Sequence, residues 1–484
     1  MKNVIEQKAL WAAVFFGLAI SAHQTFVLAA SEFSADPKET DAIVKFISNN
    51  TIEEGLPQSY RAPKGYWKSI GSRPDDIGEI MERLLVGEEG SNEAGSVNIY
   101  DAATWQITMA LTQQTKQADL WTQRLLSGSS GVLSSIKATS QYFTYNGVKL
   151  DADQAYFFRM FGNRYLMSDP LDGKDSFAGF PNSPQLHHED WKPITGENAW
   201  AAIIGPLQTA YIKYKGVVPL NSPEAKLALS ILPALKAMQS PLGAIYHAPE
   251  GTFDKDPREI SNENNISVLA ALRMLHQVAR QNNNDLLTNE IAGMMEKIEN
   301  YFKEYAFNKE AGVFYQGGKY TNGEFTPSKD FAVDCQTWGI VVLQSGWIDR
   351  QFGEGAAYKM WQQTKARAGC YENGILEGVG YTDGHDILSS DWSFGAVLMA
   401  KILSAQYKTS HPDWSEALAG DASRMREGIE TLRSVLPNGE VSYKYSNKRY
   451  YVIFGWWANP IPSLAGSTWA YLIDRDFNPF ILGG

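Results

Sequence analysis

A recurring pattern at the start of apolar segments constrains the fold of this chain more than any other feature. Five times along the sequence, an acidic residue opens a long stretch rich in alanine, glycine and aliphatic residues. A tryptophan follows within a few positions in four of the five, and a sixth stretch has a tryptophan, Trp469, but no acid. The acids are Asp101, Glu197, Glu263, Asp334 and Asp391, and the four tryptophans are Trp105, Trp200, Trp338 and Trp392.

The stretches that follow these acids are apolar nearly all round, which is typical of helices buried on every side. Each of the first five is followed by a more charged segment whose apolar residues recur at helical spacing. These amphipathic segments cover residues 116–126, 223–238, 284–305, 355–367 and 414–435, and residues 41–48 and 76–86 can supply the partner of the sixth.

A buried helix followed by an exposed helix, six times over, predicts a closed ring of helical hairpins. We therefore expect an all-α protein, an (α/α)6 barrel with an inner layer of six helices and an outer layer of six. Strand-like patterns occur at residues 141–149 and 441–454, which we interpret as small β-hairpins on the helical body. No Gly/Ser-rich linker or block of charge divides the sequence, so residues 31–484 are predicted to form one domain.

Residues 1–30 are predicted to be a cleavable signal peptide. Lys2 and Lys8 flank a short polar start, an apolar run over residues 9–22 follows, and small residues that suit cleavage come after it. The run is shorter than the about 20 residues that a membrane span needs. We expect a periplasmic or secreted protein with no stable membrane span after cleavage, and an uncleaved anchor is the alternative.

The composition narrows the range of partners. The formal net charge is −11, whereas a nucleic acid or an anionic membrane would require a basic face. Aromatic residues make up 12% of the chain, and their flat faces suit stacking on sugars, although tryptophan is also good core material. The two cysteines, Cys335 and Cys370, do not form a disulfide framework or a metal-ligand pattern. We expect no nucleic-acid partner, no metal and no cofactor.

An acid at a helix start has an ordinary structural explanation, since it satisfies free backbone N–H groups and complements the helix dipole. Parallel inner helices, however, direct all their N-termini to one end of the barrel, so these acids would converge on one cleft with aromatic side chains beside them. Glycoside hydrolysis needs two such carboxyl groups, one acting as an acid and one as a base or nucleophile. The predicted catalytic residues are Glu377, Asp101, Asp391, Asp334 and Glu263, with Glu377 and Asp101 as first choices.

The richest single loop, residues 377–392, precedes the fifth inner helix and supplies Glu377, Tyr381 and His385. Its glycines would let the backbone approach a ligand closely. The alternative is a turn-rich loop whose aspartates cap turns or hold a structural cation. We predict that a sugar is bound by Trp105, Trp200, Trp338, Trp392, Tyr381, Glu197 and His385.

Four segments resemble the six-hairpin, (α/α)6-toroid glycoside hydrolases and the polysaccharide lyases related to them. They are Tyr100-Asp101, residues 196–200, residues 334–338 and residues 391–396, and the resemblance extends over about residues 95–475. It implies an exported enzyme that cleaves a polysaccharide or oligosaccharide, often with inversion, without an obligatory cofactor. It does not assign the acid and the base.

Two further hypotheses stay open at this point. A polysaccharide lyase would need a base such as Tyr381 or His385, and Asn264 or Asn265 to neutralise a uronate, although an acidic cleft would repel that substrate. A non-catalytic periplasmic glycan-binding protein would show the same aromatic residues. In each case we expect a monomer whose partner is a glycan.

Overall fold

The computed structural model describes residues 37–51, 55–71, 86–90, 95–127, 137–138, 140, 143–161, 192–252 and 255–484. The backbone from Ala35 to Gly484 groups into one compact unit. The predicted signal peptide and most of the predicted helix over 76–86 lie outside the described residues. Among the helices of the described ranges, none combines the length and apolar character needed to cross a membrane.

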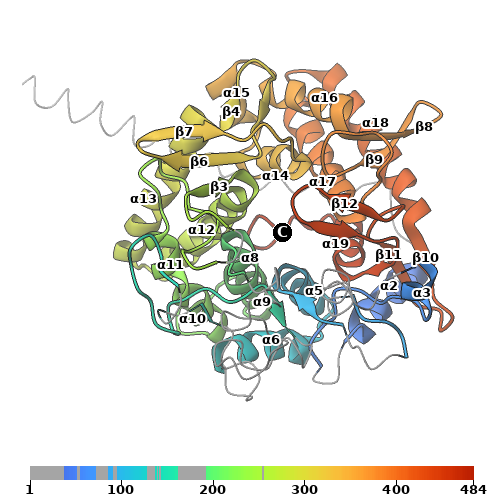
Figure 1. Ribbon diagram of the computed structural model, residues 1–484, viewed down its shortest axis with the longest axis horizontal. Helices are drawn as coiled ribbons and strands as arrows, with labels where there is room; N and C mark the ends of the chain where they lie inside the picture. The colour runs from blue at the N-terminus through green and yellow to red at the C-terminus, as the bar shows by residue number, and fades with distance from the viewer. Residues whose placement is uncertain are drawn as a thin grey trace, which may run out of the picture. The chain divides into compact units, whose positions relative to one another are not determined.

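Inner helices surround the centre of this unit (Figure 1). Each packs on the next around a closed circuit, and α19 packs on α5 to complete it. The second inner helix is continuous but contains a π-helical turn just before Pro206, a residue that has no N–H to donate. Within the described residues the six inner helices are Ile99–Leu111 (α5), Thr195–Ala199, Trp200–Ile204 and Gly205–Lys213 (α8, η3 and α9, one continuous helix), Asn262–Gln281 (α12), Val333–Leu343 (α14), Ser390–Tyr407 (α17) and Leu464–Asp474 (α19).

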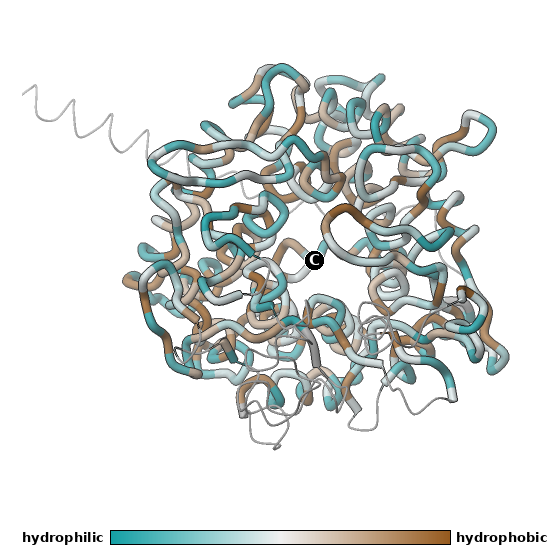
Figure 2. The backbone as a smooth tube through the Cα atoms, viewed as in Figure 1, coloured by the Kyte–Doolittle hydropathy of each residue, from teal (hydrophilic) through white to brown (hydrophobic). Residues whose placement is uncertain are grey.

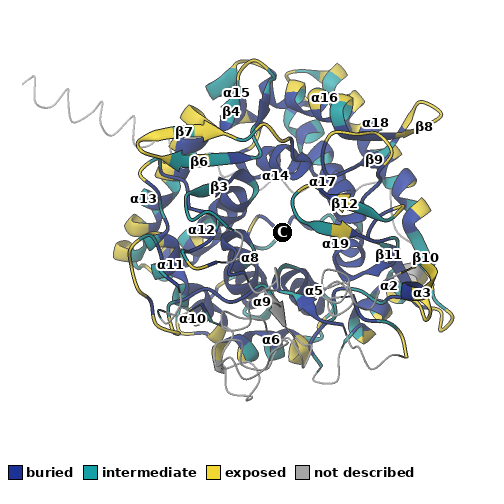
Figure 3. Ribbon diagram, viewed as in Figure 1, coloured by how far each residue is buried: buried dark blue, intermediate teal, exposed yellow. Residues whose placement is uncertain are grey.

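The outer helices each pack on an inner one, for example α6 on α5 and α18 on α17, and α2 packs on α19. They carry exposed residues on their outer faces, whereas the inner helices are buried (Figure 3). The predicted helix over 223–238 is interrupted at Ile231, and the one over 414–435 ends at Ile429. The outer and connecting helices are Pro37–Asn49 (α2), Tyr66–Ser69 (α3), Thr115–Ser127 (α6), Pro223–Ser230 (α10), Leu232–Ala237 (α11), Asp285–Tyr301 (α13), Phe302–Ala306 (η4), Ser345–Phe352 (α15), Ala356–Ala368 (α16), Pro412–Ile429 (α18) and Glu430–Leu432 (η5).

Two hydrogen bonds between side chains join the last inner helix to the first. The indole N–H of Trp469 donates to the hydroxyl of Tyr100 at 2.6 Å, and the Thr468 hydroxyl donates to that of Thr104 at 2.9 Å. Because α5 and α19 are the first and last inner helices in sequence, these contacts close the ring. The predicted (α/α)6 barrel is confirmed.

The strands form small antiparallel sheets at the ends of the hairpins. The predicted small β-hairpins are confirmed, but the two strands within residues 441–454 do not pair with each other, because β11 pairs with β10 and β14 whereas β12 pairs with β13. The hydrophobic tip of the β12–β13 hairpin lies beside the centre of the ring (Figure 2). The strands are Val97–Asn98 (β1), Met160–Phe161 (β2), Glu259–Ser261 (β3), Phe307–Asn308 (β4), Val313–Phe314 (β5), Gly317–Thr321 (β6), Glu324–Pro327 (β7), Gly369–Glu372 (β8), Ile375–Val379 (β9), Arg433–Val435 (β10), Val441–Lys444 (β11), Tyr450–Val452 (β12), Trp456–Ala458 (β13) and Pro462–Ser463 (β14).

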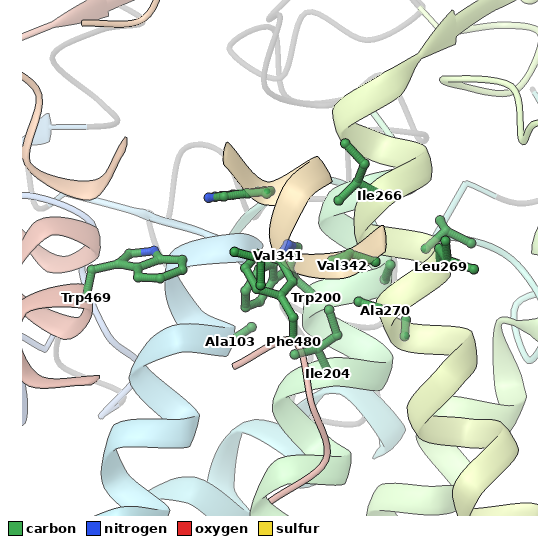
Figure 4. Packing of buried hydrophobic residues seen from close by; sticks show 14 of the residues in the cluster. Ala103, Trp200, Ile204, Ile266, Leu269, Ala270, Val341, Val342, Trp469 and Phe480 are labelled. Atoms are coloured by element: carbon green, nitrogen blue, oxygen red, sulfur yellow. The ribbon is translucent and has the colours of Figure 1, made fainter. Parts of the chain in front are cut away.

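The segment after α19 turns back into the barrel and fills its interior. Gln208 of α9 holds it in place by donating to the carbonyls of Pro479 and Ile481 and accepting from the Gly483 N–H. The ring of Phe480 then packs 5.3 Å from that of Trp200, deep among the inner helices (Figure 4). The barrel is therefore a packed core beneath the helix starts and not an open channel.

Candidate active site

Five carboxyl side chains, one from each of five inner helices, face one another at the N-terminal ends of those helices. Each lies in the first turn of its helix. These acids interact electrostatically with one another and with Arg159, so the predicted convergence of these helix starts is confirmed. We call the set the carboxylate ring, and it consists of Asp101, Glu197, Glu263, Asp334 and Asp391.

Other residues perform the capping for two of these helices. The side chain of Asn98 accepts the Tyr100 N–H at the start of α5, and that of Ser261 accepts the Asn264 N–H at the start of α12. Asp101 and Glu263, which follow these caps, are therefore not needed to satisfy the backbone at those ends. Capping therefore does not account for these two acids, although each still complements the helix dipole.

Glu263 and Asp334 form a pair of neighbouring carboxyl groups whose pKa values are both strongly raised. Burial, followed by repulsion from Asp334, raises the pKa of Glu263 to about 8, and burial raises that of Asp334 to about 7. The Ser267 hydroxyl donates to Oε1 of Glu263 at 2.8 Å and the Asn264 amide donates to Oε2 at 2.8 Å, which fixes the carboxyl in place. At neutral pH the pair can therefore retain a proton.

Asp101 and Glu197 are the members of the ring next to a cation. Arg159 donates to Glu197 Oε1 at 2.6 Å, and its charge also favours the ionised form of Asp101. Burial nevertheless raises the pKa of Asp101 to about 7, against a hydrogen bond from Ser59 that lowers it. Arg159 lowers the pKa of Glu263 as well, so this cation acts on both carboxyl groups, and the pKa of Asp101 stays below that of Glu263.

Asp391 is the most enclosed member, with 3% of its surface exposed. Burial raises the pKa of its carboxyl well above the usual range, and the charge of Asp101 raises it further. Backbone N–H groups at the start of α17, those of Asp391 itself and of Trp392, bond the carboxyl and oppose this shift. Among the described residues, no group hydrogen-bonds its Oδ1 atom.

An aromatic floor lies directly below the ring. The half-buried ring of Tyr100 packs 5.1 Å from Trp200 and 6.0 Å from Trp338, and Trp338 in turn stacks on Trp469 at 6.0 Å. Phe480 packs against these tryptophans from the opposite end of the helices. Because Trp200, Trp338 and Trp469 are buried, Tyr100 is the member of this floor on which a sugar ring could stack.

The predicted sugar-binding aromatics separate into three groups. Trp200 and Trp338 belong to the aromatic floor, whereas Trp392 and Tyr381 pack on each other at 5.0 Å beside Asp391. Trp105 faces outward, since its indole N–H donates to the Ile47 carbonyl of α2 at 3.1 Å and its side chain is fully buried. The structure does not bring Trp105 to the ring.

Glu377 and His385 are also not brought to the ring. Side chains alternate along strand β9, and Gly378 faces Ser393 of the inner helix α17, so Glu377 faces the outer helix α18 at Gly428. There its nearest acidic neighbour is Glu372 of the same hairpin. His385 is exposed, and its Nδ1 contacts the Gly369 carbonyl at 2.8 Å.

Sequence analysis did not identify Arg159, Ser267 and Tyr100 as members of the site. Arg159 lies in an irregular segment with no periodic signal, and its place beside Glu197 arises from the pairing of β1 with β2. Ser267 lies four residues after Glu263, which is one helical turn and a detectable spacing. Tyr100 immediately precedes Asp101, so its aromatic ring at a helix start was a signal of the same kind as the tryptophans.

The fold and the ring together define an (α/α)6-toroid protein with an acidic centre. Three solved structures share this fold along nearly their whole length. A D-mannose isomerase superposes with a TM-score of 0.53 at 9% identity, covering 93% of this chain and 99% of its own. A glycosidase, the variant E178A, gives 0.51 at 10% identity, and a sugar epimerase from a ruminal bacterium gives 0.50 at 11%, each covering 91% of this chain and 98% of its own.

Comparison of the sequence alone identifies no relative. No protein-family model matches the chain, and no curated protein matches it in sequence. At identities of 9–11% the similar structures establish the fold and nothing finer.

Proposed function

We propose that this protein is a carbohydrate-processing enzyme that hydrolyses a glycosidic bond at the carboxylate ring. The observation that carries the proposal is the ring itself, in which buried acids with raised pKa values interact with one another beside the cation of Arg159. Perturbed carboxyl groups grouped in this way are typical of acid/base catalysis. The glycosidase among the similar structures shows that the same fold can support this reaction.

Glu263 is the proposed general acid, because its pKa of about 8 keeps it protonated at neutral pH. It gives its proton to the glycosidic oxygen as the bond from that oxygen to the anomeric carbon breaks. Asp101 is the proposed base, because its pKa of about 7 lies below that of Glu263, so it loses its proton first. It takes a proton from the water whose oxygen bonds to the anomeric carbon. This scheme inverts the configuration at that carbon.

Sugar isomerisation is a second candidate, since an isomerase and an epimerase share the fold. Such a reaction moves a proton between carbons and needs a neutral base. His247 is favoured for that part because burial lowers its pKa and it lies close enough to Arg159 to sense its charge. Its ion-pair partner is Glu259, at 3.8 Å, and not a member of the carboxylate ring, so hydrolysis at the ring has the stronger support.

The lyase hypothesis has less support than hydrolysis. Asn264 accepts from the Gly196 N–H and donates to Glu263, and Asn265 bonds Ile245 through both its amide oxygen and its nitrogen. Neither amide is available to neutralise a uronate. Burial also raises the pKa of Tyr381 well above its usual value, which makes the phenol a poor base.

The test is to incubate the purified protein with gluco-, manno- and glucurono-configured oligosaccharides and follow the products by NMR. Hydrolysis creates a new reducing end whose first anomer shows inversion or retention. Isomerisation changes the sugar without a new end, and a lyase gives an unsaturated product. Binding without any of these products would favour the non-catalytic alternative. From the predicted signal peptide we further propose that the substrate is met outside the cytoplasm, and fractionation of the producing cell would test this.

A further inference from the structure

Two buried polar atoms beside the carboxylate ring have complementary hydrogen-bonding character. They are Oδ1 of Asp391, which can accept, and Nε1 of Trp338, which can only donate. Among the residues the structure describes, no group hydrogen-bonds either atom. Asp391 is 3% exposed and Trp338 is 4% exposed, so both atoms lie in the interior. Buried polar groups are rarely left without a partner, because each costs about 1–3 kcal/mol.

Helix geometry places the two atoms close together. Gly395 lies four residues after Asp391, and positions one turn apart on a helix have Cβ atoms about 5–6 Å from each other on one face. The Trp338 Nε1 atom lies against this same position, because a Cβ atom built on Gly395 would meet it at 2.7 Å. The absence of a side chain at residue 395 therefore lets the indole N–H approach α17 beside Asp391.

The two atoms do not bond each other, and one hydroxyl group between them would satisfy both. A hydroxyl group can donate and accept at once. Its oxygen can accept a hydrogen bond from the Trp338 N–H while its O–H donates to Oδ1 of Asp391. Sugars present many such groups. The neighbouring rings of Trp392 and Tyr100 supply apolar surface around this position, since Trp392 follows Asp391 directly and Tyr100 packs on Trp338.

We propose that Asp391 and Trp338 together bind one hydroxyl group of the sugar, and so select sugars that carry a hydroxyl at that position. This inference rests on the proposed function and deepens it. It assigns Asp391 to substrate binding, and it leaves the acid and base steps to Glu263 and Asp101. A site built to bond a substrate hydroxyl discriminates strongly against the analogue that lacks it, because the site's own polar groups are then left unpaired.

The experiment compares the parent protein with Trp338→Phe, which removes the N–H and keeps an aromatic ring. Binding of D-glucose, D-mannose and D-glucuronate, each with its series of monodeoxy analogues, is measured by saturation-transfer NMR and calorimetry. For the parent we expect one deoxy position to weaken binding about 10-fold or more. Trp338→Phe should weaken binding of the complete sugar about 10-fold and show no further loss with that one analogue.

Trp361→Phe is the matched control. Its indole N–H donates to Asp421 at 2.8 Å in the outer layer, so this variant should keep the deoxy preference of the parent. Gly395→Ala is the second test variant, in case Trp338→Phe does not fold, because its methyl group would separate the two atoms. It should abolish the same deoxy preference while the thermal unfolding temperature shows that the protein is folded.

The outcomes separate the two ideas. If the parent binds none of these sugars, both the proposed function and the inference that rests on it are wrong. If the parent binds a sugar but Trp338→Phe and Gly395→Ala retain its full deoxy preference, the inference is wrong and the proposed function stands.

Discussion

The Ser267 hydroxyl donates to Oε1 of Glu263 from one turn further along α12, at 2.8 Å. The same hydroxyl accepts the indole N–H of Trp200 at 3.0 Å, from the neighbouring inner helix. This chain of two hydrogen bonds holds the proposed acid above the aromatic floor. The orientation of Glu263 is therefore set by two helices at once, and its position relative to Asp334 does not depend on a loop.

Replacing Glu263 with glutamine should abolish most of the activity without unfolding the protein. The amide keeps the shape and can still accept from Ser267, but it cannot give a proton to a leaving oxygen. We expect kcat to fall about 10²–10⁴-fold, the usual contribution of a general acid. Steady-state kinetics on the best glycan from the product screen measures the loss, and a variant within about twofold of the parent would remove Glu263 from the role.

Replacing Glu377 with glutamine provides the matched comparison. Its pKa is also raised, but by burial and Glu372 within the β8–β9 hairpin, away from the ring. We expect kcat and KM to stay within about twofold of the parent values, because surface changes away from a site have small effects. A loss comparable to that of Glu263→Gln would show that this hairpin takes part in the reaction.

The stability of the protein should fall as the pH rises. Burial raises the pKa of Glu263 from 4.5 to about 8 and that of Asp334 from 3.8 to about 7, so the folded state holds protons that the unfolded chain releases. The associated stability is complete below the unfolded pKa values and is lost as the pH passes through the folded ones. Urea unfolding from about pH 5 to about pH 9 should show this decline, and the double variant Glu263→Gln, Asp334→Asn should show a shallower one.

Trp105→Phe should affect stability and leave sugar binding unchanged. The change leaves the buried Ile47 carbonyl without its donor, which costs about 1–3 kcal/mol. Denaturant unfolding would measure this cost, and sugar titrations would show an unchanged affinity. If the Trp105→Phe variant is fully folded and still binds sugar more weakly, the sequence-based prediction that Trp105 binds sugar would be supported.

Phe480→Ala should be among the most destabilising single changes. The ring is 3% exposed and packs on Trp200, Trp338 and Trp469, so its removal leaves a cavity at the centre of the barrel. We expect the free energy of unfolding to fall by about 3–5 kcal/mol. Leu286→Ala is a suitable control, because Leu286 is 86% exposed and its removal should cost little.

The architecture and most of the ring could be predicted from the sequence because both depend on local signals. An acid at the start of an apolar helix is visible in a few residues, and parallel inner helices bring such starts together whatever the loops between them. Asp101 and Glu263 were expected at one barrel end for this reason, and the structure places them there.

The remaining features depend on contacts that no local pattern encodes. Trp105 and Trp338 each lie four residues after an acid, yet one points to α2 and the other to the aromatic floor. Spacing gives the position of a side chain on its helix, whereas its rotamer and neighbours decide which residue it meets. The placement of Glu377 depends on the register of a hairpin, and that of Phe480 on a segment with no periodicity.

The bond between Trp469 and Tyr100 joins residues 369 positions apart, and this separation has a consequence during synthesis. A ribosome that adds about 5–20 residues per second needs roughly 20–70 s to travel between them. Throughout that interval the first inner helix is apolar on nearly every side and lacks the neighbour that covers it. Translation of this chain therefore creates a long-lived, aggregation-prone intermediate. The yield of folded protein in a cell should respond to chaperone supply and to the speed of elongation.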